Sequence, residues 1–309
     1  MRILILGAGA IGGYFGGRLV EAGADVTFLV RPRRAEQLAH DGLVIESGFV
    51  NVKLPVKCIT GGTSDRAFDM AIIACKAYDL ATAISDIVPY VGQDAAVLPL
   101  LNGIAHLDLL REAFGAENVL GGTCHIGVTV TPSGAVRHLN KLQSIALGEL
   151  AGDRSERVGT FEKLLGKAKL NARLSTDIVQ DMWNKFVMLA TLAGTTCLMR
   201  ASIGDIMKSK GGRHFIIEML QECEDIAAAT DHRPDADFMV RTRTELTTLE
   251  SPQTSSMLRD MRSGGRTEAD HILGDMVRRA QGAEIAAPLI RAAYCHLQVY
   301  ETGRQATDQ

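Results

Sequence analysis

The stretch Ile3-Leu4-Ile5-Leu6-Gly7-Ala8-Gly9-Ala10-Ile11-Gly12-Gly13 decides the fold, because an apolar strand runs directly into a G-x-G-x-x-G loop. A helix is expected over residues 14–22. In such a unit the first glycine makes a tight turn, the second admits a pyrophosphate and the third lets the helix pack closely on the strand. Free N–H groups at the helix start face the phosphates. A plain turn is the alternative, but the flanking elements favour dinucleotide binding. The predicted cofactor-binding residues are Gly7, Gly9, Ala10, Ile11 and Gly12.

The end of the second predicted strand, residues 25–30, indicates which dinucleotide binds. Chains that bind NAD usually carry an acidic residue there, about 20 residues past the glycines, which holds the ribose 2′-OH. This chain has Arg31 instead, followed by Pro32, Arg33 and Arg34. A guanidinium binds a 2′-phosphate through charge-assisted hydrogen bonds, whereas a carboxylate repels it. The arginines could merely cap a loop and open a solvated helix, but the missing acid favours NADP over NAD.

Composition and charge indicate a soluble globular chain with room for two domains. The 309 residues are 46% apolar and 22% charged, and the net charge of −3 favours neither a nucleic-acid nor a membrane partner. No apolar run approaches the roughly 18 residues of a membrane span, and Met1 leads directly into a core strand without a signal peptide. The cysteines and histidines show no metal-ligand spacing, so we expect no metal site. Cys75 and Cys197 are expected to be buried free thiols in a reduced, cytoplasmic protein.

The order of the predicted elements indicates two domains. Strands and helices alternate over residues 1–175, which predicts a Rossmann-type, doubly wound parallel sheet. Within it, Thr131-Pro132-Ser133-Gly134 predicts the turn of a hairpin over residues 128–139. Helical patterns then fill residues 176–309, so an all-α domain is expected there. Its predicted helices span residues 177–199, 204–229, 234–249, 252–262, 267–280 and 288–301.

Four predicted strand ends bring glycine or polar residues to one edge of the sheet. Those residues are Gly9, Arg31, Lys76 and Asn102. Ligands of open parallel sheets bind beyond the carboxyl ends of the strands. Taken singly, Lys76 could be an ordinary loop lysine, and Asn102-Gly103 an ordinary turn. Their shared position favours a binding role for both.

Two residues of the second half could carry chemistry. Lys185 lies in a mostly apolar helix, where an ammonium is costly unless it reaches a cleft, a partner or bulk solvent. In a dry cleft it could polarise a carbonyl and pass it a proton. Glu268 is expected in the first turn of a helix, where the helix dipole alone would favour it. It could equally orient the lysine or the cofactor, and the sequence does not decide between these interpretations.

Over essentially its whole length the chain resembles the ketopantoate reductases (2-dehydropantoate 2-reductases). The order and spacing of many short motifs make this resemblance far more specific than the glycine loop alone. The matching pieces are Gly7-x-Gly9-x-x-Gly12, Leu29-Val30-Arg31, Cys75-Lys76-Ala77, Leu101-Asn102-Gly103, Trp183-Asn184-Lys185, Ser255-Ser256-Met257-Leu258-Arg259-Asp260 and Arg266-Thr267-Glu268-Ala269-Asp270.

The resemblance implies NADPH-dependent reduction of a 2-oxo acid, with ketopantoate to (R)-pantoate, a step of pantothenate biosynthesis, as the leading reaction. It implies that Lys185 protonates the substrate carbonyl oxygen as general acid, while Glu268 organises the lysine and the bound cofactor. It also implies that Asn102 contacts substrate and nicotinamide, and that Ser256 contacts the substrate carboxylate. The residues that it assigns to the adenosine phosphate end of NADP(H) are Arg31 and Lys76.

The chain departs from the family pattern on the helix that carries Lys185. Family members commonly have asparagines four and eight residues after the lysine, on the same helix face. Here those positions are Leu189 and Ala193. The polar contacts of the two amides are therefore lost, and another branched 2-oxo acid becomes a candidate substrate. Replacement contacts from Thr195, Thr196 or Arg200 are the opposing possibility.

Two other functions stay open at this point. A 3-hydroxyacid or 6-phosphogluconate-like dehydrogenase shares the two-domain layout, but the Ser-Ser-Met and Thr-Glu motifs belong to the reductase pattern. A non-catalytic NADPH-binding sensor would need neither Lys185 nor Glu268. Exposed helical faces in the second half allow a homodimer without requiring one.

Overall fold

The computed structural model describes residues 1–62 and 67–307, and the chain divides into two compact units. Unit 1 consists of Met1–Leu101 and His106–Asp181, and unit 2 of Asn102–Ala105 and Met182–Gln309. The sequence placed a boundary between residues 175 and 176, whereas the division of the structure falls inside a helix, after Asp181. The sequence also placed Asn102 with the first half, but its contacts group it with the second unit.

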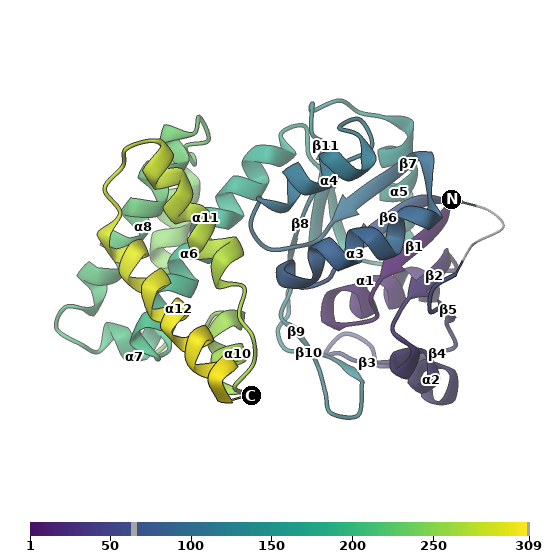
Figure 1. Ribbon diagram of the computed structural model, residues 1–309, viewed down its shortest axis with the longest axis horizontal. Coiled ribbons are helices and arrows are strands. Elements are labelled where there is room, and N and C mark those ends of the chain that lie inside the picture. Colours follow the sequence, from purple (N-terminus) through teal and green to yellow (C-terminus); the bar gives the residue numbers. More distant parts are fainter. Residues whose placement is uncertain (63–66, 308–309) are drawn as a thin grey trace. The chain divides into compact units, whose positions relative to one another are not determined.

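The central sheet of unit 1 is parallel throughout its five strands, as predicted (Figure 1). Its order is β5-β2-β1-β6-β7. The strands are β1 (Arg2–Leu6), β2 (Asp25–Leu29), β5 (Lys57–Ile59), β6 (Phe68–Ile73) and β7 (Val91–Pro99). Leu6 pairs with Leu29 on one side and with Ile73 on the other, so the carboxyl ends of β2, β1 and β6 are level.

Two smaller sheets complete unit 1. One has the order β4-β3-β10-β9 and includes the predicted hairpin, whose strands pair antiparallel. The other has the order β12-β11-β8. The strands of the first are β3 (Leu43–Glu46), β4 (Val52–Leu54), β9 (Val128–Val130) and β10 (Val136–His138), and those of the second are β8 (Leu120–His125), β11 (Ser144–Glu149) and β12 (Asn171–Leu174).

Five α-helices cover the sheets of the described part of unit 1 (Figure 1). They are α1 (Ala10–Glu21), α2 (Pro32–Asp41), α3 (Leu80–Ile87), α4 (His106–Phe114) and α5 (Glu156–Lys167). The sequence reasoning missed α5, although its signals were present. Ser155 accepts a hydrogen bond from the N–H of Val158 as N-cap, and Val158, Phe161 and Leu165 form a buried stripe at helical spacing.

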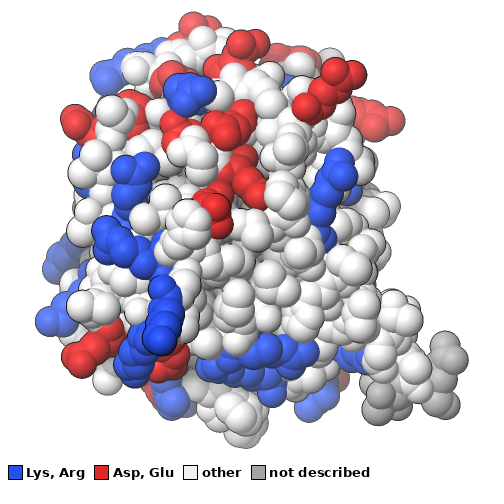
Figure 2. Space-filling view, turned by 90° about the vertical axis from the view of Figure 1, so that its left-hand side faces the viewer, with Lys and Arg blue, Asp and Glu red and all other residues white. Residues whose placement is uncertain are grey.

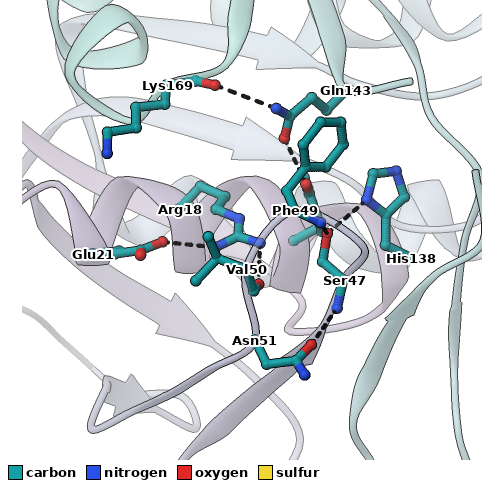
Figure 3. Close-up of polar contacts among 10 residues, drawn as sticks. Arg18, Glu21, Ser47, Phe49, Val50, Asn51, His138, Gln143 and Lys169 are labelled. Atoms are coloured by element: carbon teal, nitrogen blue, oxygen red, sulfur yellow. Dashed lines mark hydrogen bonds and ion pairs between the residues drawn. The ribbon is translucent and has the colours of Figure 1, made fainter. Parts of the chain in front are cut away.

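Polar contacts anchor the helix that follows the glycine loop (Figure 3). Arg18 is a buried residue of α1. Its guanidinium donates to Glu21 Oε2 and to the carbonyl of Val50, both at 2.7 Å. The hydroxyl of the fully buried Tyr14 donates to Gln143 Oε1 at 2.7 Å. Each of these bonds satisfies a buried polar group, so α1 has a defined position against distant parts of the chain.

Unit 2 is helical, as expected. Its helices are α6 (Ile178–Met199, which begins at the end of unit 1), α7 (Ile203–Met207), α8 (Gly212–Ala229), α9 (Ala236–Leu246), α10 (Ser256–Arg262), α11 (Ala269–Gly282) and α12 (Pro288–Thr307). The single helix predicted over residues 204–229 is wrong, because Ser202 caps a short α7 and the chain turns before Gly211 opens α8. The helix predicted from residue 252 begins later, since Ser255 serves as the N-cap of α10.

Charges of both signs lie on the face of the molecule seen in Figure 2, with acidic side chains mainly toward the top and basic ones lower down. Side chains of opposite sign adjoin in places, and uncharged surface lies between the other charged groups. Among the described residues, none of the helices is long and apolar enough to cross a membrane. Likewise, residues 1–62 and 67–307 contain no group of three or more His, Cys, Asp or Glu side chains placed to hold a metal ion.

Candidate active site

The glycine loop after β1 has a backbone that only small residues tolerate. Gly7 has φ +89°, a conformation that side chains rarely adopt. A Cβ on Gly12 would overlap the carbonyl of Gly7, so the helix lies directly against the loop. A Cβ on Gly9 would meet nothing within 4 Å, so the backbone there is open to a ligand. The chemistry of the loop therefore fits a dinucleotide pyrophosphate.

Helix α1 begins at Ala10, four residues before the predicted start, because Gly9 already takes the extended N-cap conformation. The first turn of α1 contains no acidic side chain that would repel a phosphate. The N-terminal end of a helix has a partial positive charge, because its first N–H groups have no hydrogen-bond partner within the helix. The earlier start puts Ala10, Ile11 and Gly12 in that first turn.

The three arginines after β2 have different environments. The Arg31 side chain is 84% exposed and lies 3.8 Å from Asp79 Oδ2, while Arg33 is also exposed. Arg34 is half-buried and donates hydrogen bonds to the carbonyls of Ala8 and Gly134, both at 2.9 Å. Arg31 and Arg33 are thus available to a ligand, whereas the guanidinium of Arg34 is already bound within the protein.

Lys76 follows β6, the strand next to β1. It is half-buried, and its carbonyl accepts a hydrogen bond from the N–H of Asp79 at 2.9 Å, which opens a short 3-10 turn. Because the ends of β2, β1 and β6 are level, Arg31, the glycine loop and Lys76 follow neighbouring strands at one sheet edge. Asp79, close to Arg31, is a residue of this edge that sequence reasoning missed.

In unit 2, Lys185 projects from α6, which is connected to two other helices. Trp183 of α6 is buried, and Arg279 of α11 lies over its ring at 5.0 Å. Farther along α6, Thr196 Oγ1 and Ser255 Oγ are 2.9 Å apart, and Ser255 immediately precedes Ser256. Lys185 itself is half-buried. The helices that carry Lys185, Ser256 and Glu268 are therefore joined by contacts within unit 2.

Glu268 is buried and lies at the N-cap position of α11, one residue before the helix. Its side chain makes no capping hydrogen bond, although its position at the helix start still lets the helix dipole favour its negative charge. The preceding Thr267 donates through its N–H and Oγ1 to Glu301 Oε1 at 2.6 and 2.7 Å. These bonds hold the start of α11, and with it the buried Glu268, in place.

His271 of α11 contacts the loop that carries Asn102. One turn after Glu268 on α11, its imidazole hydrogen-bonds the backbone of Asn102. A Cβ on Gly103 (φ +77°) would lie 3.1 Å from His271 Cδ2, so the Asn102 loop packs directly on this ring. Burial lowers the pKa of His271, and the charges of Glu268 and Asp275 oppose that effect. Sequence reasoning missed His271, although its spacing of three residues from Glu268 puts both on one helix face.

The structure narrows the choice of replacement contacts near Leu189 and Ala193. Thr196 cannot supply one, because its hydroxyl is fully buried and bonds the carbonyl of Leu192 at 2.7 Å and Ser255 at 2.9 Å. Thr195 is also fully buried, but its Oγ1 has no hydrogen-bond partner among the described residues. Arg200 lies exposed at the end of α6, with its Nε 3.4 Å from His296 Nε2.

The fold defines the class of this protein as a Rossmann-type α/β unit joined to a helical unit. Residues 3–152 match the family Ketopantoate reductase PanE/ApbA, and residues 177–301 match Ketopantoate reductase PanE/ApbA C terminal. The chain therefore belongs to the ketopantoate reductase family and is an oxidoreductase of that family.

Individual relatives extend over the full chain. The uncharacterized oxidoreductase YkpB of Bacillus subtilis is 38% identical over 301 residues, which cover 97% of this chain and 99% of YkpB. The 2-dehydropantoate 2-reductase of a Nostoc species is 27% identical and aligns with 100% of this chain and 97% of its own. A D-mandelate dehydrogenase solved with NADH and anilino(oxo)acetate superposes with a TM-score of 0.89, over 99% of this chain and 100% of its own. At 22% identity, that last likeness establishes a shared fold.

Proposed function

We propose that this protein reduces a 2-oxo acid with NADPH, and that 2-dehydropantoate, reduced to (R)-pantoate, is the leading substrate. The observation that carries the proposal is family membership together with retention of Lys185, Glu268 and Asn102 in one unit. Such a unit can hold a carbonyl substrate against an ammonium group, which is the arrangement that general acid catalysis requires.

Within this proposal each residue has a chemical task. Bound NADPH supplies the hydride that reaches the ketone carbon. The Lys185 ammonium donates a proton to the carbonyl oxygen as negative charge develops there. Glu268 orients the ammonium and the cofactor, and Asn102 orients the substrate carbonyl. Ser256 binds the substrate carboxylate.

The cofactor assignment depends on unit 1. Its glycine loop and the first turn of α1 would bind the pyrophosphate, and Arg31 with Lys76 would bind the adenosine phosphate end. The exposed Arg31 at the end of β2 is the feature that favours NADPH over NADH, because it can form charge-assisted bonds to a 2′-phosphate.

A second candidate substrate is a 2-oxo acid with an apolar branched tail. Leu189 and Ala193 offer no hydrogen-bonding group where the family pattern has amides, and the hydroxyl of Thr196 is already bound. A hydroxyl of 2-dehydropantoate would therefore gain less from this helix face than from one bearing asparagines.

The test is NADPH oxidation by the purified protein, followed with a panel of 2-oxo acids that includes 2-dehydropantoate and 2-oxoisovalerate. The proposal expects turnover with at least one of them and little with NADH. Tight NADPH binding without turnover of any 2-oxo acid would contradict the enzymatic proposal and favour a sensor. In a parallel assay of NADP⁺ reduction, turnover of 3-hydroxy acids without any reduction of 2-oxo acids by NADPH would favour the other dehydrogenase class.

A further inference from the structure

Arg34 reaches two segments that are far from it in the sequence. Its Nη2 donates to the carbonyl of Ala8, inside the glycine loop, at 2.9 Å. Its Nη1 donates to the carbonyl of Gly134, at the tip of the β9–β10 hairpin, also at 2.9 Å. One planar guanidinium therefore links the loop to a hairpin that is 100 residues away from the arginine in the chain.

The hairpin tip is itself well defined. Gln37, one turn after Arg34 on α2, accepts from Arg34 Nη1 at 2.7 Å and donates through Nε2 to the carbonyl of Ser133 at 2.6 Å. The tip is closed by a hydrogen bond from the N–H of Gly134 to the carbonyl of Thr131 at 2.8 Å. Arg34 thus connects the glycine loop to a rigid support.

A second contact joins the same hairpin to the start of α1. Val136 of β10 is fully buried, and a Cβ on Gly13 would come within 2.8 Å of its Cγ2. Ala8, Val136 and Ile45 belong to one buried core. The hairpin therefore packs beneath the glycine motif and also bonds to it through Arg34.

These bonds offset the cost of partly burying a cation. Burial lowers the pKa of Arg34, although an arginine remains protonated at neutral pH. Within residues 1–62 and 67–307 its hydrogen-bond acceptors are two backbone carbonyls and the Gln37 amide oxygen, and no carboxylate forms an ion pair with it. Ala8 is only 3% exposed, and a buried backbone carbonyl requires a hydrogen-bond partner. Arg34 supplies that partner.

We propose that Arg34 is a positioning residue that holds the dinucleotide-binding loop in its binding conformation, and not a ligand of the 2′-phosphate. This inference rests on the proposed cofactor function of residues 7–12. A loop whose backbone must approach a pyrophosphate closely loses affinity when it is free to shift, and this loss is the same for every dinucleotide that carries the pyrophosphate. Arg31 should affect the two cofactors unequally. As a ligand of the 2′-phosphate it contributes to the binding of NADPH, which carries that phosphate, and not to the binding of NADH.

The experiment measures the Kd of NADPH and of NADH for the wild type, Arg34→Lys and Arg34→Met. Amide hydrogen exchange at Gly7 and Gly13, whose N–H groups donate to the carbonyls of Leu29 and Gly9, is measured in parallel without ligand. Lysine keeps the charge but cannot donate to both carbonyls in the fork geometry of arginine. We expect both variants to bind each cofactor about tenfold more weakly, with the ratio of the two Kd values unchanged within about twofold. Exchange in the loop should be about tenfold faster.

Two further variants keep the test decisive. Gln37→Ala removes the amide that supports the hairpin tip, and it should produce the same pattern more weakly even if the Arg34 variants fail to fold. His40→Ala changes an exposed side chain near the end of α2 and should behave as the wild type.

Three outcomes would overturn the inference: wild-type affinity in Arg34→Lys with a loss only in Arg34→Met, a selective loss of NADPH binding, or unchanged loop exchange. Absence of binding of both cofactors to the wild type would refute the proposed function. The exchange measurement would then still decide whether Arg34 holds the loop.

Discussion

At the scale of single residues, Lys185 is the most consequential side chain of the proposed mechanism. We expect Lys185→Ala to lower kcat by a factor of roughly 10² to 10⁴, the usual contribution of a general acid, with little change in the Kd of NADPH. Lys208→Ala, which removes an exposed lysine paired with Asp205 at 2.9 Å in the same unit, serves as the control. Near-normal turnover of Lys185→Ala in steady-state assays would show that the amine is structural.

Arg31 carries the second prediction at this scale. Replacing it by Asp removes a charge-assisted contact, worth about 1.5 to 3 kcal/mol or one to two decades in affinity, and adds repulsion toward a 2′-phosphate. The preference for NADPH over NADH should narrow or reverse in titrations of both cofactors. Asp79→Asn removes the carboxylate 3.8 Å from Arg31 and should preserve the preference. Equal dissociation constants in the wild type would refute the assignment.

At the scale of elements, the face of α6 that follows Lys185 sets the third prediction. The wild type should accept 2-oxoisovalerate with a kcat/KM within a modest factor of that for 2-dehydropantoate, because Leu189 cannot bond the extra hydroxyl. Leu189→Asn should raise the ratio in favour of 2-dehydropantoate roughly tenfold, the value of one regained buried hydrogen bond. Leu189→Met, which conserves an apolar side chain, is the matched control. A wild-type ratio of several thousand would show that the hydroxyl is still recognised, and Thr195 would then be the first residue to change.

Local signals made the central elements predictable from the sequence. The strand, glycine loop and helix at residues 3–21 were recognisable because each part has its own pattern, and the hairpin because its turn residues are specific. The break between α7 and α8 was missed, since the turn before Gly211 interrupts a pattern that reads as continuous. The contacts of Arg34 with Ala8 and Gly134, and of His271 with the Asn102 loop, join residues too distant in sequence for any periodicity to reveal.

At the scale of the whole molecule, the six cysteines are all free thiols in different environments. Burial raises the pKa of Cys197 to about 11 and that of the fully buried Cys223 to about 12, whereas Cys295 is exposed. Because the thiolate is the reactive form, an alkylating reagent at neutral pH should modify Cys295 first in the native protein. Cys197 and Cys223 should react only after denaturation. Peptide mass spectrometry over a time course checks this order, and native-state labelling of Cys223 as fast as that of Cys295 would contradict it.

The packing of the Asn102 loop on His271 has a consequence for how the protein is made. The two residues are separated by 271 − 102 = 169 positions. At a synthesis rate of about 5–20 residues per second, roughly 10 to 30 seconds pass between their addition to the nascent chain. All five strands of the parallel sheet have been added to the chain before that interval begins, whereas the ring that contacts the Asn102 loop is added only at its end. A message truncated between the codons for residues 181 and 271 would therefore encode all of unit 1 but not the histidine on which the Asn102 loop packs.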